Sequence, residues 1–445
     1  MFTKILIANR GEVAVRIIRA CKEMGISTVA VFSEADRDGL WVSLADEAYC
    51  IGPAFLKDSY LNMTAIIDVA VATGAQAVHP GYGLLSENAR FAELCGQCGI
   101  KFIGPDYKVI NAMGNKDEAR RTMRKAGVPV VPGMDAITDV DEALKVAREI
   151  GYPVIVKASA GGGGRGIRIV ETEEELPKAI NIASSEAAGA FGNGEVYLEK
   201  YLTHVKHVEV QLLCDEHGNI VTLGERDCSV QRKNQKIIEE SPCATLPDAV
   251  RKKMFAAARK AAETVGYTSA GTVEFLYDGK DKFYFMEMNT RLQVEHPVTE
   301  YVSGVDLVKW QIRIAAGVAL EIQQTDVRLS GCAIECRINS EDVKNNFRPS
   351  CGTISLLHIP GGPWVRFDTA IYQGYTIPPY YDSMIGKLIV YARDRKEAIR
   401  KLNAALCELV VEGVNYNAEL GCDILSEREF DDGTYCTDFM LTHKF

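Results

Sequence analysis

The sequence contains no apolar run long enough to cross a bilayer, and it begins Met-Phe-Thr-Lys-Ile-Leu-Ile-Ala, which is typical of a strand rather than of a signal peptide. It also lacks an excess of positive charge, because 50 lysine and arginine residues face 60 aspartate and glutamate residues and leave a net charge of −10. A nucleic-acid surface needs a basic field. We therefore expect neither a membrane span nor a nucleic-acid partner.

The cysteine pattern excludes a disulfide framework. The 13 cysteines are odd in number and scattered, so we expect reduced thiols and a cytoplasmic location. Cys95 and Cys98 form a lone CxxC motif with no second pair and no nearby histidine, which favours a structural role over a zinc or redox site. Repeats and low-complexity segments are absent, and 445 residues are too many for one core, so two or three domains are expected.

Residues 1–111 alternate strand-like and helix-like segments, which predicts parallel βαβ units in a Rossmann-like N-terminal domain. The segment lacks the GxGxxG fingerprint, so a dinucleotide site is not favoured. The loop 79–83 (His-Pro-Gly-Tyr-Gly) follows a strand, where open α/β sheets place their ligands, and a plain turn is an equal alternative. A smaller α/β unit is expected up to about residue 203, and antiparallel strands follow. The predicted fold class is therefore α/β and α+β.

A predicted hairpin near residue 280 carries the strongest chemical signal. Two strand-like runs, 271–277 and 283–289, flank the turn 278–282, and a symmetric turn would pair Phe283 with Asp278 and Glu287 with Glu274. Strict alternation would put Phe283, Phe285, Glu287 and Asn289 on one face. Two opposed carboxylates repel unless a cation lies between them. Oxygen ligands indicate magnesium or manganese, and the alternative is an edge hairpin with solvated acids.

The loop 161–166 (Gly-Gly-Gly-Gly-Arg-Gly) is the second signal. Glycines let backbone amides approach an oxyanion. The loop joins two strands and no Lys-Ser/Thr pair follows, so it is not a Walker P-loop and instead indicates a flap over phosphates. Lys157, on the apolar strand before the loop, also suggests an anion nearby. Lys116 is a weaker candidate for an anion contact, because taken alone it would be interpreted as a surface residue.

Three further segments are ambiguous when taken alone. The basic run 231–236 (Gln-Arg-Lys-Asn-Gln-Lys) is either a solvated turn or partly directed inward. The segment 199–202 (Glu-Lys-Tyr-Leu) ends a strand and could offer its backbone to a base. Arg337 lies in an apolar run, as a buried cation or as a cross-strand partner of Glu335 or another acid.

Together these segments resemble the ATP-grasp superfamily and, within it, the biotin carboxylases. The likeness runs from the first strand to about residue 440, and several long matches in one order make it specific. The matching segments are 7–14 (Ile-Ala-Asn-Arg-Gly-Glu-Val-Ala), 79–88 (His-Pro-Gly-Tyr-Gly-Leu-Leu-Ser-Glu-Asn), 157–166 (Lys-Ala-Ser-Ala-Gly-Gly-Gly-Gly-Arg-Gly), 225–229 (Glu-Arg-Asp-Cys-Ser), 287–300 (Glu-Met-Asn-Thr-Arg-Leu-Gln-Val-Glu-His-Pro-Val-Thr-Glu) and 378–387 (Pro-Pro-Tyr-Tyr-Asp-Ser-Met-Ile-Gly-Lys).

The resemblance implies an ATP-grasp fold in three parts. These are a Rossmann-like N-terminal domain (1–111), an ATP-grasp domain (112–329) with a mobile lid at about 130–203, and a C-terminal antiparallel-sheet domain (330–445). It also implies which residues contact the nucleotide and two Mg²⁺ or Mn²⁺ ions. The implied ATP contacts are Lys116, Lys157, Gly162, Gly163, Gly164, Gly166, Glu199, Lys200, Leu202, His207, Gln231, Asn234 and Leu276. The implied metal ligands are Glu274, Glu287 and Asn289.

The same resemblance implies the chemistry. Glu295 would deprotonate bicarbonate, which Lys236, Arg291, Gln293 and Val294 would position. Attack of bicarbonate on ATP would give carboxyphosphate, which releases carbon dioxide and phosphate. Phosphate would take the proton from the ureido nitrogen of biotin. Arg337 would stabilise the resulting enolate, and Tyr82 would lie near biotin.

One position departs from the family pattern. Asn234 stands where the family often has histidine, so it can hydrogen-bond a nucleotide but cannot transfer a proton.

The resemblance further implies a homodimer that works with other chains. Arg19 and Glu23 on the first helix are candidate dimer contacts, with an intrahelical ion pair as the default. No Met-Lys-Met biotin-attachment site is found, so the biotin carboxyl carrier protein and the carboxyltransferase are expected on other chains. The expected role is the first half-reaction of acetyl-CoA carboxylase, or the same role in a pyruvate or propionyl-CoA type carboxylase. Another ATP-grasp ligase and a non-catalytic homologue are the competing hypotheses.

Overall fold

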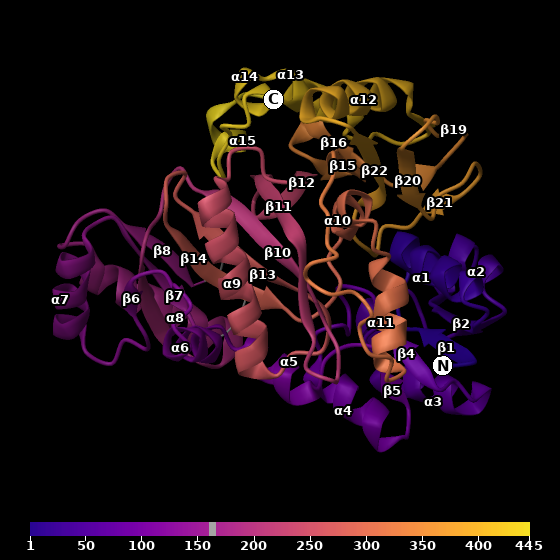
Figure 1. Cartoon of the computed structure of the whole chain (residues 1–445), viewed down its shortest axis with the longest axis horizontal. Helices are drawn as coiled ribbons and strands as arrows, with labels where there is room; N and C mark the ends of the chain where they lie inside the picture. The colour runs from indigo at the N-terminus through magenta and orange to yellow at the C-terminus, as the bar shows by residue number, and fades with distance from the viewer. Residues whose placement is uncertain (160–165) are drawn as a thin grey trace.

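A computed structural model describes residues 1–159 and 166–445 and shows three sheet-centred regions (Figure 1). The N-terminal region holds a parallel sheet, the four-stranded sheet of the expected lid projects to one side, and the largest sheet fills the centre. Among the described residues, no helix is both long and apolar enough to cross a membrane.

The N-terminal sheet is parallel, as the alternation of strand and helix predicts. Its strand order is β3-β2-β1-β4-β5, and apolar side chains on both faces are buried against helices. Arg19 and Glu23 lie on α1, where Glu23 pairs with Lys309 at 2.5 Å rather than with Arg19. The elements are β1 (Lys4–Ile7), α1 (Gly11–Glu23), β2 (Ser27–Phe32), α2 (Leu40–Leu44), β3 (Glu47–Cys50), α3 (Met63–Thr73), β4 (Ala77–His79), α4 (Ala89–Gln97), β5 (Lys101–Phe102), α5 (Tyr107–Gly114) and α6 (Lys116–Lys125).

The four-stranded sheet has its own small core, formed where α7 and α8 cover its apolar face. Its order is β6-β9-β7-β8, and the glycine loop connects β7 to β8, as the sequence predicts. The elements are β6 (Gly133–Met134), α7 (Val140–Ile150), β7 (Val154–Ala158), β8 (Ile167–Val170), α8 (Leu176–Phe191) and β9 (Val196–Lys200).

The central sheet has eight strands in the order β14-β13-β10-β11-β12-β15-β22-β20. Because β12 pairs with β15, with Ile238 opposite Cys336 and Glu239 opposite Glu335, one sheet continues past residue 330. Helices α9 and α12 cover one face, and α10 covers the other. The strands are β10 (Lys206–Cys214), β11 (Ile220–Arg232), β12 (Gln235–Ser241), β13 (Ser269–Tyr277), β14 (Phe283–Asn289), β15 (Cys332–Asn339), β20 (Val365–Thr369) and β22 (Met384–Ala392).

Helices and short strands complete the second half of the chain. The helices are α9 (Asp248–Val265), α10 (His296–Ser303), α11 (Leu307–Ala315), α12 (Arg395–Glu408), α13 (Ala418–Ser426), α14 (Arg428–Asp431) and α15 (Phe439–Thr442). The short strands are β16 (Glu341–Asp342), β17 (Arg348–Pro349), β18 (Gly352–Thr353), β19 (Leu356–His358), β21 (Thr376–Ile377) and β23 (Val410–Glu412).

The β13–β14 hairpin confirms one predicted pair and corrects another. Glu274 does face Glu287, but Phe283 faces Tyr277 rather than Asp278, because a β-bulge shifts the register by one residue. The bulge also reverses the side-chain alternation along β14. Phe283 and Phe285 consequently pack into the core beneath α9 instead of sharing a face with Glu287.

This core predicts the effect of truncating Phe285. Its side chain is 2% exposed, so Phe285→Ala should lower the free energy of unfolding by about 3–5 kcal/mol. Lys282→Ala, at an exposed position of the same hairpin, is the matched control and should change it by less than about 0.5 kcal/mol. Denaturant unfolding measures both, and equal effects would contradict the placement of Phe285.

Candidate active site

A buried charged cluster lies on the face of the central sheet that α10 covers. Its side chains come from β10, β11, β12, β13 and β15, and from the segment that follows β14. The cluster comprises Glu209, Arg226, Lys236, Glu239, Glu274, Gln293, Glu295, Glu335 and Arg337.

Glu295 is held between two cations. One carboxylate oxygen accepts a hydrogen bond from Lys236 at 2.5 Å, and the other accepts one from Arg337 at 2.9 Å. Burial raises the pKa of Glu295, but the positive charges of Lys236, Arg337 and Arg226 outweigh it and hold this pKa well below its usual range. Glu295 is therefore an ionised carboxylate, and it becomes a stronger base when a ligand draws these cations away.

Lys236 also contacts two other carboxylates, Glu209 at 2.8 Å and Glu274 at 3.2 Å. Its orientation depends on an irregularity in the β11–β12 ladder, where the register shifts at Ile237. The extra residue brings Lys236 and Glu239 to the same face, although strict alternation would separate them.

Arg226 supports the cluster from within the sheet and is completely buried. Its guanidinium donates to Glu209 at 2.5 Å and to Gln211 at 2.7 Å, with further bonds to Thr299 and Thr272. A buried guanidinium needs such a full set of acceptors. These contacts fix Glu209, which in turn orients Lys236.

The predicted metal ligands lie beside Lys236. Glu274 and Glu287 face each other across β13 and β14, and Lys116 stands 3.2 Å from Glu287. Glu274 has His207 Nε2 at 2.9 Å, and it accepts from the amide of Asn289 at 2.9 Å. Positive groups and hydrogen-bond donors therefore already compensate the negative charge of Glu274 and Glu287. A divalent cation bound there would supply the same compensation. Adjacent carboxylate oxygens fit magnesium or manganese.

Arg291 binds side chains on the metal side of the cluster. It donates to Glu87 at 2.9 Å, to Gln293 at 3.0 Å and to the side-chain oxygen of Asn289 at 3.1 Å. Gln293 in turn donates to Glu274 at 2.9 Å. The segment after β14 thus presents Arg291, Gln293 and Glu295 toward the same space.

Tyr82 connects to the cluster through two other groups. Its hydroxyl donates to Glu12, and the ammonium of Lys387 lies 3.2 Å from the same carboxylate. Lys387 also donates to the backbone oxygen of Val294 at 2.7 Å. The N-terminal loop is therefore tied to the residue that precedes Glu295.

The expected nucleotide contacts of the lid lie on the four-stranded sheet. The ammonium of Lys157 pairs with Glu199 at 2.7 Å, so this lysine has a carboxylate partner where an anionic ligand was expected. Arg120 contacts the other oxygen of Glu199 at 3.1 Å. Lys200 donates to two backbone oxygens of the lid, and half-buried Leu202 follows β9.

The glycine loop is only partly described. Gly162, Gly163 and Gly164 lie outside the described residues. Gly166, just before β8, has φ of +69°, and a Cβ there would stand 2.9 Å from that of Ala158. Both features require glycine.

The remaining nucleotide candidates lie around β10 and β11. His207 faces Leu276 across the β10–β13 ladder. Gln231 is half-buried near the end of β11. Asn234 is exposed in the β11–β12 turn with φ of +63°, a conformation that asparagine tolerates better than most residues.

The sequence interpretation did not assign Glu209, Arg226 or Glu239 to the site. A usable signal was the polar residue at every second position of β10, namely His207, Glu209 and Gln211, because alternation places them on one face. Glu239 gave no comparable signal, since its partner Arg337 lies on a strand far away in the sequence. Arg226 gave none either, because it is a single arginine within β11.

Glu239 and Glu335 are opposed on adjacent strands β12 and β15. Glu239 accepts from Arg337 at 2.6 Å, whereas neither oxygen of Glu335 has a hydrogen-bond partner among the described residues. Burial raises the pKa of Glu239 to about 7, with the attraction of Arg337 opposing it. Burial, opposed by Lys387 and reinforced by Glu239, raises the pKa of Glu335 well above its usual range. Glu335 therefore holds a proton more tightly than an ordinary glutamate does.

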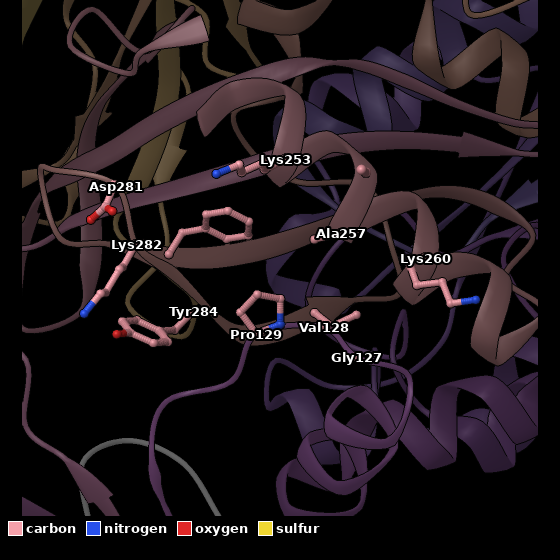
Figure 2. A pocket seen from close by; sticks show the side chains of 11 residues that line it. Gly127, Val128, Pro129, Lys253, Ala257, Lys260, Asp281, Lys282 and Tyr284 are labelled. Carbon is pink, nitrogen blue, oxygen red and sulfur yellow. The ribbon is translucent and has the colours of Figure 1, made fainter. Parts of the chain in front are cut away.

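A surface groove lies away from this cluster (Figure 2). Gly127, Val128 and Pro129 form one wall, α9 forms another, and Phe283 and Tyr284 of β14 complete it. Phe283 belongs to the core on the α9 side of the sheet, so the groove opens on the face opposite Glu295. Its lining is mostly apolar and offers no acid–base group paired with a cation as Glu295 is.

Three family models match the chain in order. They are the biotin carboxylase N-terminal domain over residues 1–110, the ATP-binding domain of the carbamoyl-phosphate synthase L chain over 115–323, and the biotin carboxylase C-terminal domain over 335–442. Biotin carboxylase 1 of Bacillus subtilis (strain 168) is 56% identical over 445 residues, which is 100% of this chain and 99% of the relative. The chain belongs to the biotin carboxylase family. It is an ATP-dependent ligase with the ATP-grasp biotin carboxylase fold.

Solved biotin carboxylase structures resemble the whole chain. A complex of biotin carboxylase with βγ-ATP from Campylobacter jejuni has a TM-score of 0.95 at 49% identity, covering 100% of this chain and 99% of that one. The biotin carboxylase domain dimer of 2-oxoglutarate carboxylase from Hydrogenobacter thermophilus, solved with MgADP, ADP and bicarbonate, has a TM-score of 0.94 at 52% identity and covers 100% and 98%. A curated relative from Methanothermobacter thermautotrophicus, named as part of pyruvate carboxylase, is 52% identical over 99% of this chain and 90% of its own length.

The raised pKa of Glu335 predicts a pH-dependent stability. The folded protein keeps a proton on Glu335 that the unfolded chain releases above about pH 4.3. The contribution of Glu335 to the free energy of unfolding is complete below that pH. It falls by about 1.4 kcal/mol per pH unit as the pH rises toward the pKa of Glu335 in the folded protein. Glutamine does not titrate, so Glu335→Gln removes this loss. The stability of the variant relative to the parent should therefore be higher at pH 8 than at pH 5. Thermal unfolding at both pH values measures this, with exposed Glu412→Gln as the control. A variant with the parent's pH dependence would show that folding does not raise the pKa of Glu335.

Proposed function

We propose that the chain carboxylates biotin on a biotin carboxyl carrier protein, with bicarbonate and ATP as substrates, as the first half-reaction of acetyl-CoA carboxylase. The observation that carries the mechanism is Glu295, an ionised carboxylate with Lys236 and Arg337 on its two oxygens. A base next to two cations suits a reaction that first deprotonates an anion and then stabilises new negative charge.

The proposed nucleotide contacts are supported by the charge and the position of the residues involved. Lys116 and Lys157 are cations whose partners, Glu287 and Glu199, leave them part of the way open to solvent, so both can turn to phosphate oxygens. Glu199, Lys200 and Leu202 are proposed for the base, with His207, Gln231, Asn234 and Leu276 nearby. The glycines of the loop, including Gly166, would cover the phosphates.

Glu274 and Glu287, with Asn289 assisting, are proposed to hold magnesium or manganese. The bound ions would neutralise phosphate charge during phosphoryl transfer. Metal binding at Glu287 would require Lys116 to move away from this carboxylate, which would free the Lys116 ammonium for the nucleotide. The same carboxylates therefore couple nucleotide entry to metal entry.

Bicarbonate is proposed to bind where Lys236, Arg291, Gln293 and Val294 converge. The anion would compete with Glu295 for Lys236, and loss of that cation raises the basicity of Glu295. Glu295 would then take the bicarbonate proton, and the dianion would attack the γ-phosphoryl group to give carboxyphosphate and ADP. Carbon dioxide and phosphate follow, and phosphate would accept the ureido proton of biotin.

Arg337 is proposed to stabilise the biotin enolate, with Tyr82 near the ring. Arg337 has Glu239 as a second partner, so its guanidinium remains neutralised and oriented when Glu295 takes up a proton. Oriented donors stabilise a developing oxyanion without reorganisation.

The carboxyl group is proposed to pass from biotin to a final acceptor. Acetyl-CoA is our choice, and a pyruvate or propionyl-CoA type carboxylase is the alternative, which the likeness to the pyruvate carboxylase relative supports. The name of the 2-oxoglutarate carboxylase relative points to another keto acid. We also propose a homodimer, the domain boundaries 1–111, 112–329 and 330–445, and carrier and carboxyltransferase partners on other chains. The 13 free cysteines support a reducing, cytoplasmic location.

Glu295→Gln tests the proposed base. The substitution preserves shape but removes the proton acceptor, so bicarbonate-dependent ATP hydrolysis should fall by about 10²–10⁴-fold. Glu263→Gln, an exposed change of the same chemistry, should keep parental activity. Circular dichroism and nucleotide binding would establish that the Glu295→Gln variant is folded, and a folded variant with parental turnover would refute the assignment.

Arg337→Ala separates the two halves of the reaction. Loss of the enolate-stabilising donor should lower biotin carboxylation by about 10²–10³-fold, while biotin-independent ATP hydrolysis falls less. Both rates are measured with bicarbonate and magnesium, with exposed Arg328→Ala as the control. An equal loss of both rates would argue against a role at biotin.

A further inference from the structure

Two cysteines meet on the outer layer of the C-terminal region. Cys407 lies on α12 and Cys422 on α13, and their Sγ atoms are 3.8 Å apart. Cys407 is exposed and Cys422 is half-buried. Figure 1 shows α12 and α13 together at the top of the molecule, on the outside of the central sheet. The pair is thus open to small solutes and lies outside the charged cluster around Glu295.

The surrounding core, rather than the thiols, sets this separation. Gly421 precedes Cys422, and a Cβ at Gly421 would stand 2.9 Å from Leu406 and 3.2 Å from Cys336 Sγ, so α13 packs closely against α12 and β15. The start of α13 is fixed as well, because the side chain of Asn417 donates to the backbone oxygen of Arg337 at 3.0 Å and accepts from the amide of Asn339 at 2.7 Å.

The CxxC motif differs from this pair. Cys95 is fully buried on α4, and burial raises the pKa of its thiol to about 12. Cys98 is exposed at the end of the same helix. The motif that the sequence makes conspicuous therefore places one thiol out of reach of solutes, whereas Cys407 and Cys422, 15 residues apart, are brought together only by the fold.

We propose that Cys407 and Cys422 are a reversible oxidation site that forms an intramolecular disulfide when the protein meets peroxide. A disulfide has its sulfurs about 2.05 Å apart, so the Sγ atoms need to approach by about 1.8 Å, which side-chain rotation can supply. The cross-link would join α12 to α13 without moving either helix from the core.

The chemistry balances with peroxide as the only added reagent. The Cys407 thiolate attacks one peroxide oxygen, the O–O bond breaks, and hydroxide leaves, which gives a sulfenic acid. The Cys422 sulfur then attacks that sulfur and loses its proton, while the S–O bond breaks and water leaves. Two thiols and one hydrogen peroxide thus become one disulfide and two waters.

Exposure decides the order of these steps. Burial, the Cys407 thiol and Asp423 raise the pKa of Cys422 to about 12, so Cys422 is a thiol at neutral pH. The accessible Cys407 is the sulfur that meets peroxide, and Cys422 is the resolving partner. The nearest nucleophile for a Cys407 sulfenic acid is therefore in the same chain.

The test is peptide mapping of the intact, folded protein after limiting hydrogen peroxide. Free thiols are alkylated before digestion, and the expected product is one cross-linked peptide pair containing Cys407 and Cys422, with 11 of the 13 thiols still alkylated. Dithiothreitol should restore all 13. Cys407→Ser should abolish the cross-link, whereas Cys50→Ser, at another exposed cysteine, should leave it intact.

A second measurement needs no oxidant. Phenylarsine oxide bridges two neighbouring thiols, so it should protect Cys407 and Cys422 from alkylation in the parent and in Cys50→Ser, but not in Cys407→Ser. Peroxide products limited to a Cys407 sulfinic acid, or a disulfide between two molecules, together with no arsenical protection, would overturn the proposal.

Discussion

The neutralisation of buried carboxylates around Glu295 is the constraint on which the rest of the structure depends. Glu209, Glu274 and Glu295 share the ammonium of Lys236, and Arg226 and Arg337 supply the remaining charge. Taking such ions out of water costs several kcal/mol each unless the partners are close and well oriented. The fold therefore has to hold every member of this set in place. A substrate anion that enters the set redistributes its cations, which is how binding can alter the basicity of Glu295.

The central sheet meets this requirement through register. The β13–β14 bulge directs Glu287 to the charged face while Phe285 fills the core, and the shift at Ile237 directs both Lys236 and Glu239 inward. Each irregularity costs a ladder hydrogen bond but places a charged group where alternation would not. The four-stranded sheet has a different arrangement, in which Lys157 and Glu199 neutralise each other at the position where a nucleotide is proposed to bind.

The main features of the fold and several residues of the candidate site could be predicted from the sequence. Alternating patterns were enough for the N-terminal parallel sheet. The predicted pair of Glu274 and Glu287 was confirmed, but only because the β13–β14 bulge offsets a turn that is one residue longer than predicted. The resemblance to biotin carboxylases singled out Glu295, Lys236 and Arg337, which the structure brings together, although their roles stay predictions. The positions of Phe283 and Phe285 were wrong because a bulge leaves no clear mark in an apolar run. Arg226 and Glu239 were missed because their burial depends on strands far away in the sequence.

The pairing of β12 with β15 has a consequence for how the chain can be divided. Strand β12 would be a sheet edge if the chain stopped near residue 330, with the backbone groups of Ile238, Glu239 and Glu240 left without their ladder partners. The unpaired backbone groups of an uncovered sheet edge can pair with other chains, which leads to aggregation. The boundary that sequence families recognise there consequently separates two homology units but cuts through one hydrogen-bonded layer. Residues on both sides of it are expected to gain and lose their structure together.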